Sequence, residues 1–183
     1  IYFEQAQLRV MDVPVFFFPY LRLPDPSLKR ATGFLVPELT TSTTLGTAIR
    51  TPYCINLSDH HDITLSPMVS SRTKTLGLRY RHAYHTGTIE LEGAYSRDTL
   101  LAGQDRGYLF GTADFALDSG YALRGQLQST SDPAYLFEYH VKEIDRLENK
   151  ITLERSQSDR NIELRFSNYH SLRDSESNAT QPT

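Results

Sequence analysis

Polar and apolar residues alternate along most of this chain. Between residues 75 and 84, every second side chain is apolar or aromatic: Leu76, Leu78, Tyr80, His82 and Tyr84. The same period of two recurs in residues 88–97, 120–129 and 161–169. A period of two is typical of β-strands with two different faces, whereas a helix would repeat every 3.6 residues. The pattern therefore predicts an all-β protein.

Strand-like runs follow one another with turn residues between them, which favours an antiparallel meander of about nine strands. The expected strands are 33–43, 46–56, 62–70, 75–84, 88–97, 107–117, 120–129, 149–157 and 161–169. Residues 138–148, inside the longest loop, could add a turn of helix.

One hairpin can be tested for register from its turn, His85-Thr86-Gly87. If paired residue numbers add to 171, charges of opposite sign meet on one face and apolar residues meet on the other. A single register that satisfies both faces is expected of a real hairpin. The polar face then carries a cross-strand salt ladder, in which Arg81 faces Glu90 and Arg79 faces Glu92.

Two prolines interrupt the first two expected strands. A turn near Thr44-Leu45 gives paired numbers a sum of about 89, which places Pro37 opposite Pro52. Proline has no N–H to donate and is normally kept out of sheet interiors. Opposed prolines would make a weak seam, typical of a strand pair that has to open. An edge strand or a bulge would also explain a proline, as at Pro67, and both interpretations stay open.

Composition narrows the class of protein. The chain has 183 residues, 39 % of them hydrophobic, and a net charge of −3, so it is no basic nucleic-acid binder. Apolar runs are too short for a transmembrane helix, whereas strands of about ten alternating residues could form a transmembrane barrel. Short turns alternate with longer loops, as in outer-membrane barrels. Because the chain begins at Ile1 inside a strand-like segment, we expect a piece of a longer protein.

Candidate chemistry is sparse. His60-His61-Asp62 contains metal-ligand residue types, but adjacent strand residues point to opposite faces and converge poorly on a metal, which favours a solvated turn. Cys54 is the one cysteine and has no matching motif. Glu90 and Glu92 could act as an acid–base pair, yet their opposed arginines favour a structural role. We therefore expect no enzyme, no cofactor and no metal site.

Several segments in order resemble the LptD family, the lipopolysaccharide-assembly proteins of the outer membrane. The resemblance rests on Val13 to Pro24 (VPVFFFPYLRLP), Gly33 to Pro37 (GFLVP), Pro52-Tyr53, Asp62 to Pro67 (DITLSP) and Ser131 to Leu136 (SDPAYL). The chain departs from the family where a usual Pro-Tyr-Tyr-Trp run reads Pro52-Tyr53-Cys54-Ile55.

The resemblance implies an incomplete part of a large transmembrane β-barrel in the cell outer membrane. Residues 1–24 would be the last strands of a periplasmic β-jelly roll, 30–170 the first barrel strands and 171–183 a polar loop or tail. The implied partners are lipopolysaccharide, an LptE-like plug lipoprotein and an LptA-like periplasmic bridge that docks on the jelly roll.

The resemblance also implies roles for residues. Pro37 and Pro52 would weaken a lateral gate between the first and last barrel strands. The acyl chains would pass Val13, Val15, Phe17 and Leu21, and the salt ladder of Arg79, Arg81, Glu90 and Glu92 would face the lumen. Apart from the resemblance, the residues also allow a soluble β-sandwich or small barrel that binds a ligand, or an enzyme that uses His60-His61-Asp62.

Overall fold

The computed structural model describes residues 2–10, 13–22, 31–157 and 160–173. Within these ranges the protein is almost entirely β. The strands are β1 (Tyr2–Val10), β2 (Val13–Arg22), β3 (Gly33–Phe34), β4 (Glu38–Ser42), β5 (Gly46–Arg50), β6 (Tyr53–Ser58), β7 (His61–Val69), β8 (Thr73–Tyr84), β9 (Gly87–Asp98), β10 (Asp105–Ala116), β11 (Tyr121–Thr130), β12 (Arg146–Ser156) and β13 (Asn161–Ser171). Two short helical turns accompany them, η1 (Asp118–Gly120) and α1 (Tyr135–Glu138).

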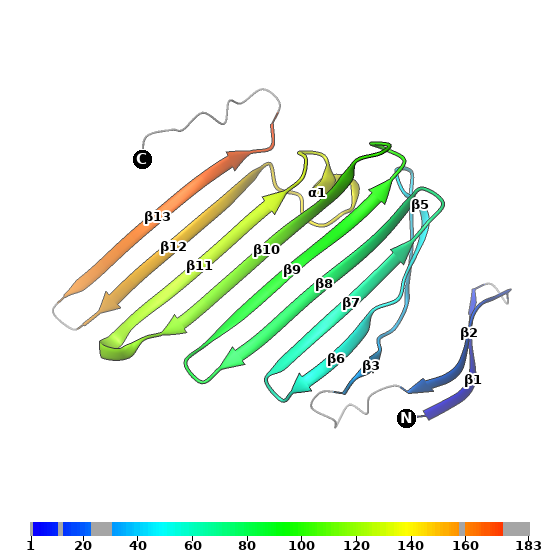
Figure 1. The fold of residues 1–183 in the computed structure, drawn as a ribbon, viewed down its shortest axis with the longest axis horizontal. Coiled ribbons are helices and arrows are strands. Elements are labelled where there is room, and N and C mark those ends of the chain that lie inside the picture. The colour runs from blue at the N-terminus through cyan, green and yellow to red at the C-terminus, as the bar shows by residue number, and fades with distance from the viewer. Residues whose placement is uncertain (1, 11–12, 23–30, 158–159, 174–183) are drawn as a thin grey trace.

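Eleven strands form one antiparallel sheet, in which β4 and β13 lie at opposite edges (Figure 1). The all-β meander is therefore confirmed, and it is an open sheet rather than two packed sheets. Nine expected runs become eleven strands because the first two runs each break at a proline. β1 and β2 pair in a sheet of their own. The division into residues 1–24, 30–170 and 171–183 stays a prediction, and residues 174–183 lie outside the described residues.

The β8–β9 hairpin has the expected register. Arg81 lies opposite Glu90, and Leu76 lies opposite Tyr95. The long strands β8, β9 and β10 have 12 residues each, or about 40 Å at the usual rise per residue. The turns that follow β6, β8 and β10 lie at one end of the sheet, and the longer loops and α1 lie at the other, together with the short turns after β4 and β7 (Figure 1). We call these the turn end and the loop end.

The hydrophobic core lies near the loop end, where the β11–β12 loop folds against one face of the sheet. Tyr135 and Leu136 of α1 are fully buried there, together with Tyr139 and Leu147. The helical turn expected within residues 138–148 is therefore misplaced, since the helix occupies Tyr135–Glu138. The Asp132-Pro133 pair just before it suits a turn into a helix. We call the face that carries this loop the inner face.

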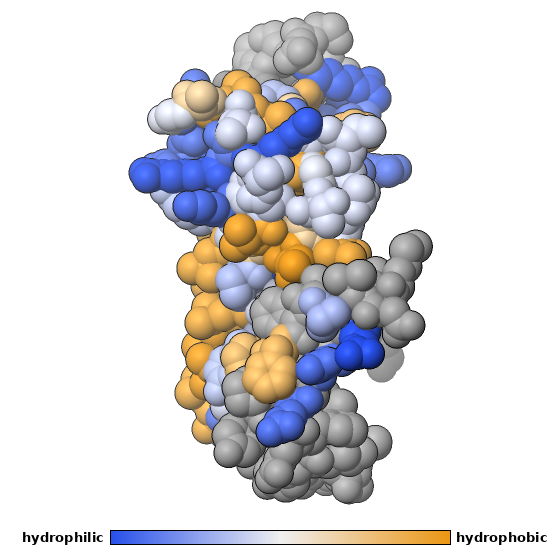
Figure 2. Space-filling model, turned by 90° about the vertical axis from the view of Figure 1, so that its right-hand side faces the viewer, coloured by the Kyte–Doolittle hydropathy of each residue, from blue (hydrophilic) through white to orange (hydrophobic). Residues whose placement is uncertain are grey.

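The opposite, outer face exposes large apolar side chains from neighbouring strands. It carries Leu76, Leu78, Leu91, Tyr95, Leu109, Leu127, Ile151, Leu164 and Phe166. Figure 2 views the molecule edge-on and shows hydrophobic residues gathered along one side, below a cap of hydrophilic ones. A monomer in water rarely leaves so extensive an apolar face uncovered. Among the described residues, no helix is long and apolar enough to cross a membrane.

Candidate functional site

The first edge of the sheet is interrupted at its prolines. Between β4 and β5, Glu38 lies opposite Arg50, and the residue numbers of every pair from there to the turn add up to 88. Beyond the prolines, Phe34 lies opposite Tyr53, and the sum is 87. The expected direct opposition of Pro37 and Pro52 is therefore wrong. Three residues of the first strand, 35–37, span the same gap as residues 51 and 52, which is a one-residue bulge.

Each half of the interruption has its own hydrogen bonding. The N–H of Leu35 donates to the carbonyl oxygen of Pro52 at 2.8 Å. The N–H and C=O of one strand residue point to the same side, so the donor that Pro52 lacks would point at Leu35. On the other side, the N–H of Thr51 donates to the carbonyl oxygen of Pro67 at 3.0 Å. Pro52 thus weakens the pairing with the edge strand, whereas Pro67 weakens a pairing inside the sheet.

The bulge changes which residues of the edge strand face inward. Leu35 in the first half and Glu38 in the second half both line a pocket on the inner face. In a regular strand, residues on one face are all odd-numbered or all even-numbered. Leu35 and Glu38 break this rule because one extra residue is inserted between them. On the neighbouring strand, Arg50 and Pro52 line the same pocket without such a change. The distortion is therefore confined to the edge strand.

The pocket holds about 320 Å³. Its floor is a row of small residues across neighbouring strands, where Ser66 lies opposite Gly77 and Gly77 lies opposite Ala94. Pro52 and Leu35 stand at the edge of the sheet, and Tyr135 and Tyr139 of the β11–β12 loop stand at the other side. The pocket therefore connects the interrupted edge with the folded loop.

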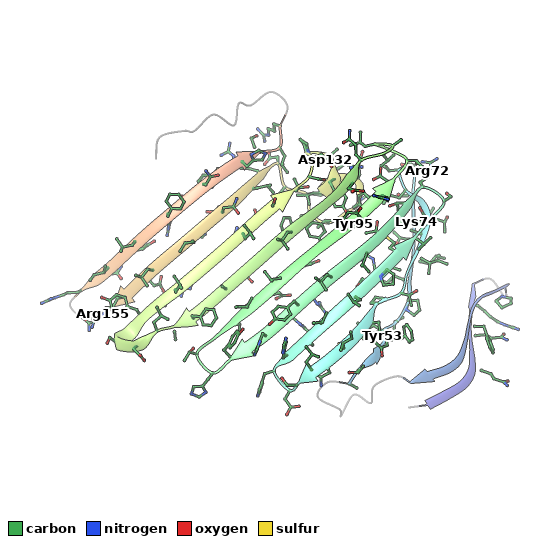
Figure 3. All side chains as sticks on the ribbon, in the orientation of Figure 1. Tyr53, Arg72, Lys74, Tyr95, Asp132 and Arg155 are labelled. Atoms are coloured by element: carbon green, nitrogen blue, oxygen red, sulfur yellow. The ribbon has the colours of Figure 1, made fainter. Side chains whose placement is uncertain are left out.

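Arg106 holds the β11–β12 loop on the inner face. Its guanidinium donates to both carboxylate oxygens of Asp132, at 2.9 and 2.7 Å, to Asp98 at 2.9 Å and to Glu138 at 2.7 Å. The Arg106 side chain is 1 % exposed and that of Asp98 is 0 % exposed. Asp132 and Glu138 come from the loop, and Asp98 comes from the end of β9. A buried cation with three carboxylates thus ties the loop to two strands; Figure 3 shows Asp132 at the loop end.

Two tyrosines complete this anchor. The rings of Tyr135 and Tyr139 stack with centroids 4.3 Å apart, and the Arg106 guanidinium lies 5.4 Å from the Tyr135 ring. The Tyr139 hydroxyl donates to Asp98 at 2.8 Å, and the Tyr135 hydroxyl is 2.6 Å from the Ser96 hydroxyl. Buried polar groups need such partners, since an unmatched one costs about 1–3 kcal/mol. Every charge that the loop brings to this cluster is matched.

Burial and hydrogen bonding set the ionisation of the loop residues. Burial raises the pKa of the Tyr135 hydroxyl to about 12, and burial likewise raises the pKa of Tyr139. Burial opposes ionisation of Asp132, but hydrogen bonds from Arg106 and Ser131 outweigh it and lower the pKa of the carboxyl. At neutral pH both tyrosine hydroxyls are therefore neutral and Asp132 is a carboxylate.

Acid should release the loop only at low pH. A carboxyl whose folded pKa is lowered stabilises the fold above its ordinary pKa, about 3.9 for Asp. That stability disappears as the pH falls through the lower folded value. The near-ultraviolet circular dichroism of the packed tyrosines should hold from pH 7 to about 5 and decline below about 4. Asp132→Asn should make this transition smaller without abolishing it, because burial of Asp98 is likewise outweighed by hydrogen bonds, which lower the pKa of that carboxyl too. A decline between pH 7 and 5 would contradict the anchor.

The four residues of the expected salt ladder lie in the expected rungs, but their ion pairs differ. Arg81 pairs with Asp62 on the adjacent strand, through two hydrogen bonds of 3.1 and 3.0 Å. Glu92 accepts a hydrogen bond from the Tyr108 hydroxyl at 2.9 Å. Arg79 forms no hydrogen bond or ion pair with any residue that the structure describes. A lumen-lining role for these residues stays a prediction.

The residues expected along the acyl-chain path can be placed only in part. Phe17 of β2 is 54 % exposed. The side chains of Val13, Val15 and Leu21 lie outside the described part of the structure. Their role stays a prediction.

The histidines of the 60–62 segment lie at the turn end. The His61 ring stacks on the His82 ring, with centroids 4.3 Å apart, and Asp62 is held by Arg81. Within the described residues, no three or more His, Cys, Asp or Glu side chains are grouped to hold a metal ion. Cys54 is a half-buried free thiol.

One family model and two curated proteins show what this chain is similar to. The LptD family model, described as "LPS transport system D", matches residues 104–183. The LPS-assembly protein LptD of Shewanella denitrificans is 36 % identical over 135 residues, which are 71 % of this chain and 17 % of that protein. LPS-assembly protein LptD of Xanthomonas oryzae pv. oryzae is 30 % identical over 137 residues, 74 % of this chain and 17 % of its own length. The chain thus spans under a fifth of these curated relatives.

Proposed function

Because the chain belongs to the LptD family, we propose that it forms the first wall strands of an outer-membrane transporter that delivers lipopolysaccharide to the outer leaflet. The transport involves no catalysis. The outer apolar face meets lipid and the inner face meets the lumen, as alternating strands of a membrane barrel require. Strands of 12 residues are long enough to cross a bilayer at a tilt.

The observation that carries the proposal is the interrupted edge. β3 and β4 lie at the first edge of the sheet, and the bulge and Pro52 remove pairing between them and the next strand. In the whole barrel this edge would meet the last strand. A weakly held edge strand can move away from that partner, which would open a lateral gate for the lipid.

The proposed roles of the other segments are those that the resemblance to the LptD family implies. Residues 1–24 would end a periplasmic jelly roll on which an LptA-like bridge docks, and Val13, Val15, Phe17 and Leu21 would border the acyl chains. An LptE-like lipoprotein would fill the lumen beside the inner face. Arg79, Arg81, Glu90 and Glu92 would face that lumen.

Restoring the missing donor should slow export. Pro52→Ala places an N–H opposite Leu35, and the double variant Pro37→Ala/Pro52→Ala also returns an N–H to the edge strand itself, so the edge should be held more tightly. One hydrogen bond contributes about 1 kcal/mol, which shifts an open–closed equilibrium about fivefold. In cells whose full-length transporter carries these changes, newly made lipopolysaccharide should reach the surface several times more slowly.

Pro67→Ala is the matched control for this experiment. It also adds an N–H, but that donor points at Thr51 inside the sheet, away from the edge. Export should then match the unaltered protein. Equal export rates for the double variant and the unaltered protein would remove the gate role from Pro37 and Pro52.

A further inference from the structure

The inner-face pocket contains one cation, Arg79, that has no partner among the described residues. Arg79 lines the pocket, and its Nε is buried without a hydrogen bond. The carboxylate directly opposite Arg79 on β9 belongs to Glu92, but Glu92 accepts a hydrogen bond from Tyr108 and forms no ion pair with Arg79. A half-buried guanidinium usually finds an anion or several acceptors. Here no described residue supplies them.

A second polar group points to the same place. Thr64 lies directly opposite Arg79 on β7 and also lines the pocket. Its side chain is buried, with 4 % of the residue exposed, and its hydroxyl has no hydrogen-bond partner. A buried hydroxyl without a partner carries a desolvation cost. Two opposed residues of the pocket lining thus carry donors that have no partner among the described residues.

The other charges of the pocket are accounted for. Glu38 lies 3.6 Å from Arg50 in an ion pair at the rim. Arg81 does not line the pocket and pairs with Asp62 of β7. The small floor residues Ser66, Gly77 and Ala94 leave room above them for a ligand group. The free donors Arg79 and Thr64 therefore set the chemistry of the pocket.

We propose that this pocket binds a phosphate group of the glycolipid that moves along the inner face, held by the Arg79 guanidinium and the Thr64 hydroxyl. Guanidinium donors are arranged in a fork that fits an oxyanion, and charge-assisted hydrogen bonds are the strong ones. A volume of about 320 Å³ suits a headgroup rather than a whole lipid. This inference rests on the proposed transport function and names the part of the lipid that the inner face recognises.

The phosphate site lies close to the interrupted edge of the sheet, where the lateral gate is proposed to open. Leu35 and Pro52 close the pocket on the side of the interrupted edge. A phosphate held at Arg79 of β8 would therefore be separated from the edge strands β3 and β4 by β7 and by β5 and β6. The folded β11–β12 loop closes the opposite side through Tyr135 and Tyr139, so the edge is the way out along the sheet.

Photocrosslinking tests the site in the full-length transporter. A benzoylphenylalanine at Leu35, on the pocket rim, should form an adduct with lipopolysaccharide in the purified detergent-solubilised protein. Arg79→Gln should lower the adduct yield about tenfold, as expected for loss of a charge-assisted hydrogen bond. Thr64→Val should lower it about threefold, and Arg79→Lys should restore part of it. An excess of inorganic phosphate should compete in the unaltered protein.

The matched control is Arg124→Gln. Arg124 lies on the inner face but is already paired with Asp114 and Glu154, at 3.2 and 2.8 Å, so the yield should not change. Enzymatically dephosphorylated lipopolysaccharide should label the unaltered protein as weakly as native lipopolysaccharide labels Arg79→Gln. Equal labelling of unaltered protein and Arg79→Gln by native lipid would overturn the phosphate site and leave transport standing. No adduct at Leu35 in the unaltered protein would overturn both.

Discussion

Replacing Arg106 with methionine should release the β11–β12 loop from the sheet. The change leaves Asp98, Asp132 and Glu138 close together without their shared cation, and Asp98 is fully buried. Breaking a buried ion pair by removing one partner typically costs about 3–5 kcal/mol. We expect a loss of this size in the free energy of unfolding. Protease cleavage between residues 131 and 145 should become fast under conditions where the unaltered protein resists.

Arg124→Met provides the comparison for Arg106→Met. It removes the same group from the inner face, but the Arg124 side chain is half exposed and its pairs are on the surface. Surface ion pairs contribute about 0–1 kcal/mol. If both variants lose similar stability, or if the loop stays protected in Arg106→Met, the anchor does not depend on Arg106.

A charge in the middle of the outer face should prevent correct insertion into a bilayer. Leu109 lies near the centre of β10 and is exposed on the apolar face. An arginine on the lipid face near the bilayer midplane costs about 2–4 kcal/mol. Leu109→Arg in the full-length transporter should therefore lower the yield of heat-modifiable, folded protein in lipid vesicles by more than tenfold.

Thr112→Arg tests the same strand on its other face. Thr112 is exposed and pairs with Glu90, which belongs to the polar side of the sheet. An arginine there would face water and a carboxylate, so the folded yield should stay close to normal. Equal yields for Leu109→Arg and Thr112→Arg would contradict the assignment of the outer face to lipid.

The sequence predicted the parts of the fold that depend on local pattern. The β8–β9 register follows from a short turn and two consistent faces, and both are written in adjacent residues. The order of strands and the position of the loops follow from the same alternation. These features need no knowledge of distant contacts, which is why they agree with the structure.

The register at the prolines could not be predicted in the same way. Phe34, Leu35 and Val36 are all apolar, so the alternation of polar and apolar residues does not show which of them face inward. A constant pair sum assumes that neither strand carries an extra residue, and the bulge at 35–37 breaks that assumption. The prolines indicated a disturbance but not its form.

The buried cluster around Arg106 was missed entirely. Its members come from β9, β10 and the β11–β12 loop, so no local motif contains them. Tyr135 and Tyr139, four residues apart after Asp132-Pro133, were the available signal, because that spacing places both rings on one side of a helical turn. Arg79 was expected to pair with Glu92 because opposed charges usually attract, but Tyr108 occupies that carboxylate instead.

The bulge divides the free edge of the sheet into two short stretches, each of which can pair with another strand. β4 offers five residues and β3 offers two, Leu35 continues the β3 register through its hydrogen bond to Pro52, and residues 36 and 37 separate the two halves. A partner strand that closed on this edge would therefore form two separate sets of hydrogen bonds, each small. Either set could separate while the other held, so the seam could part in stages and need not open along its whole length at once.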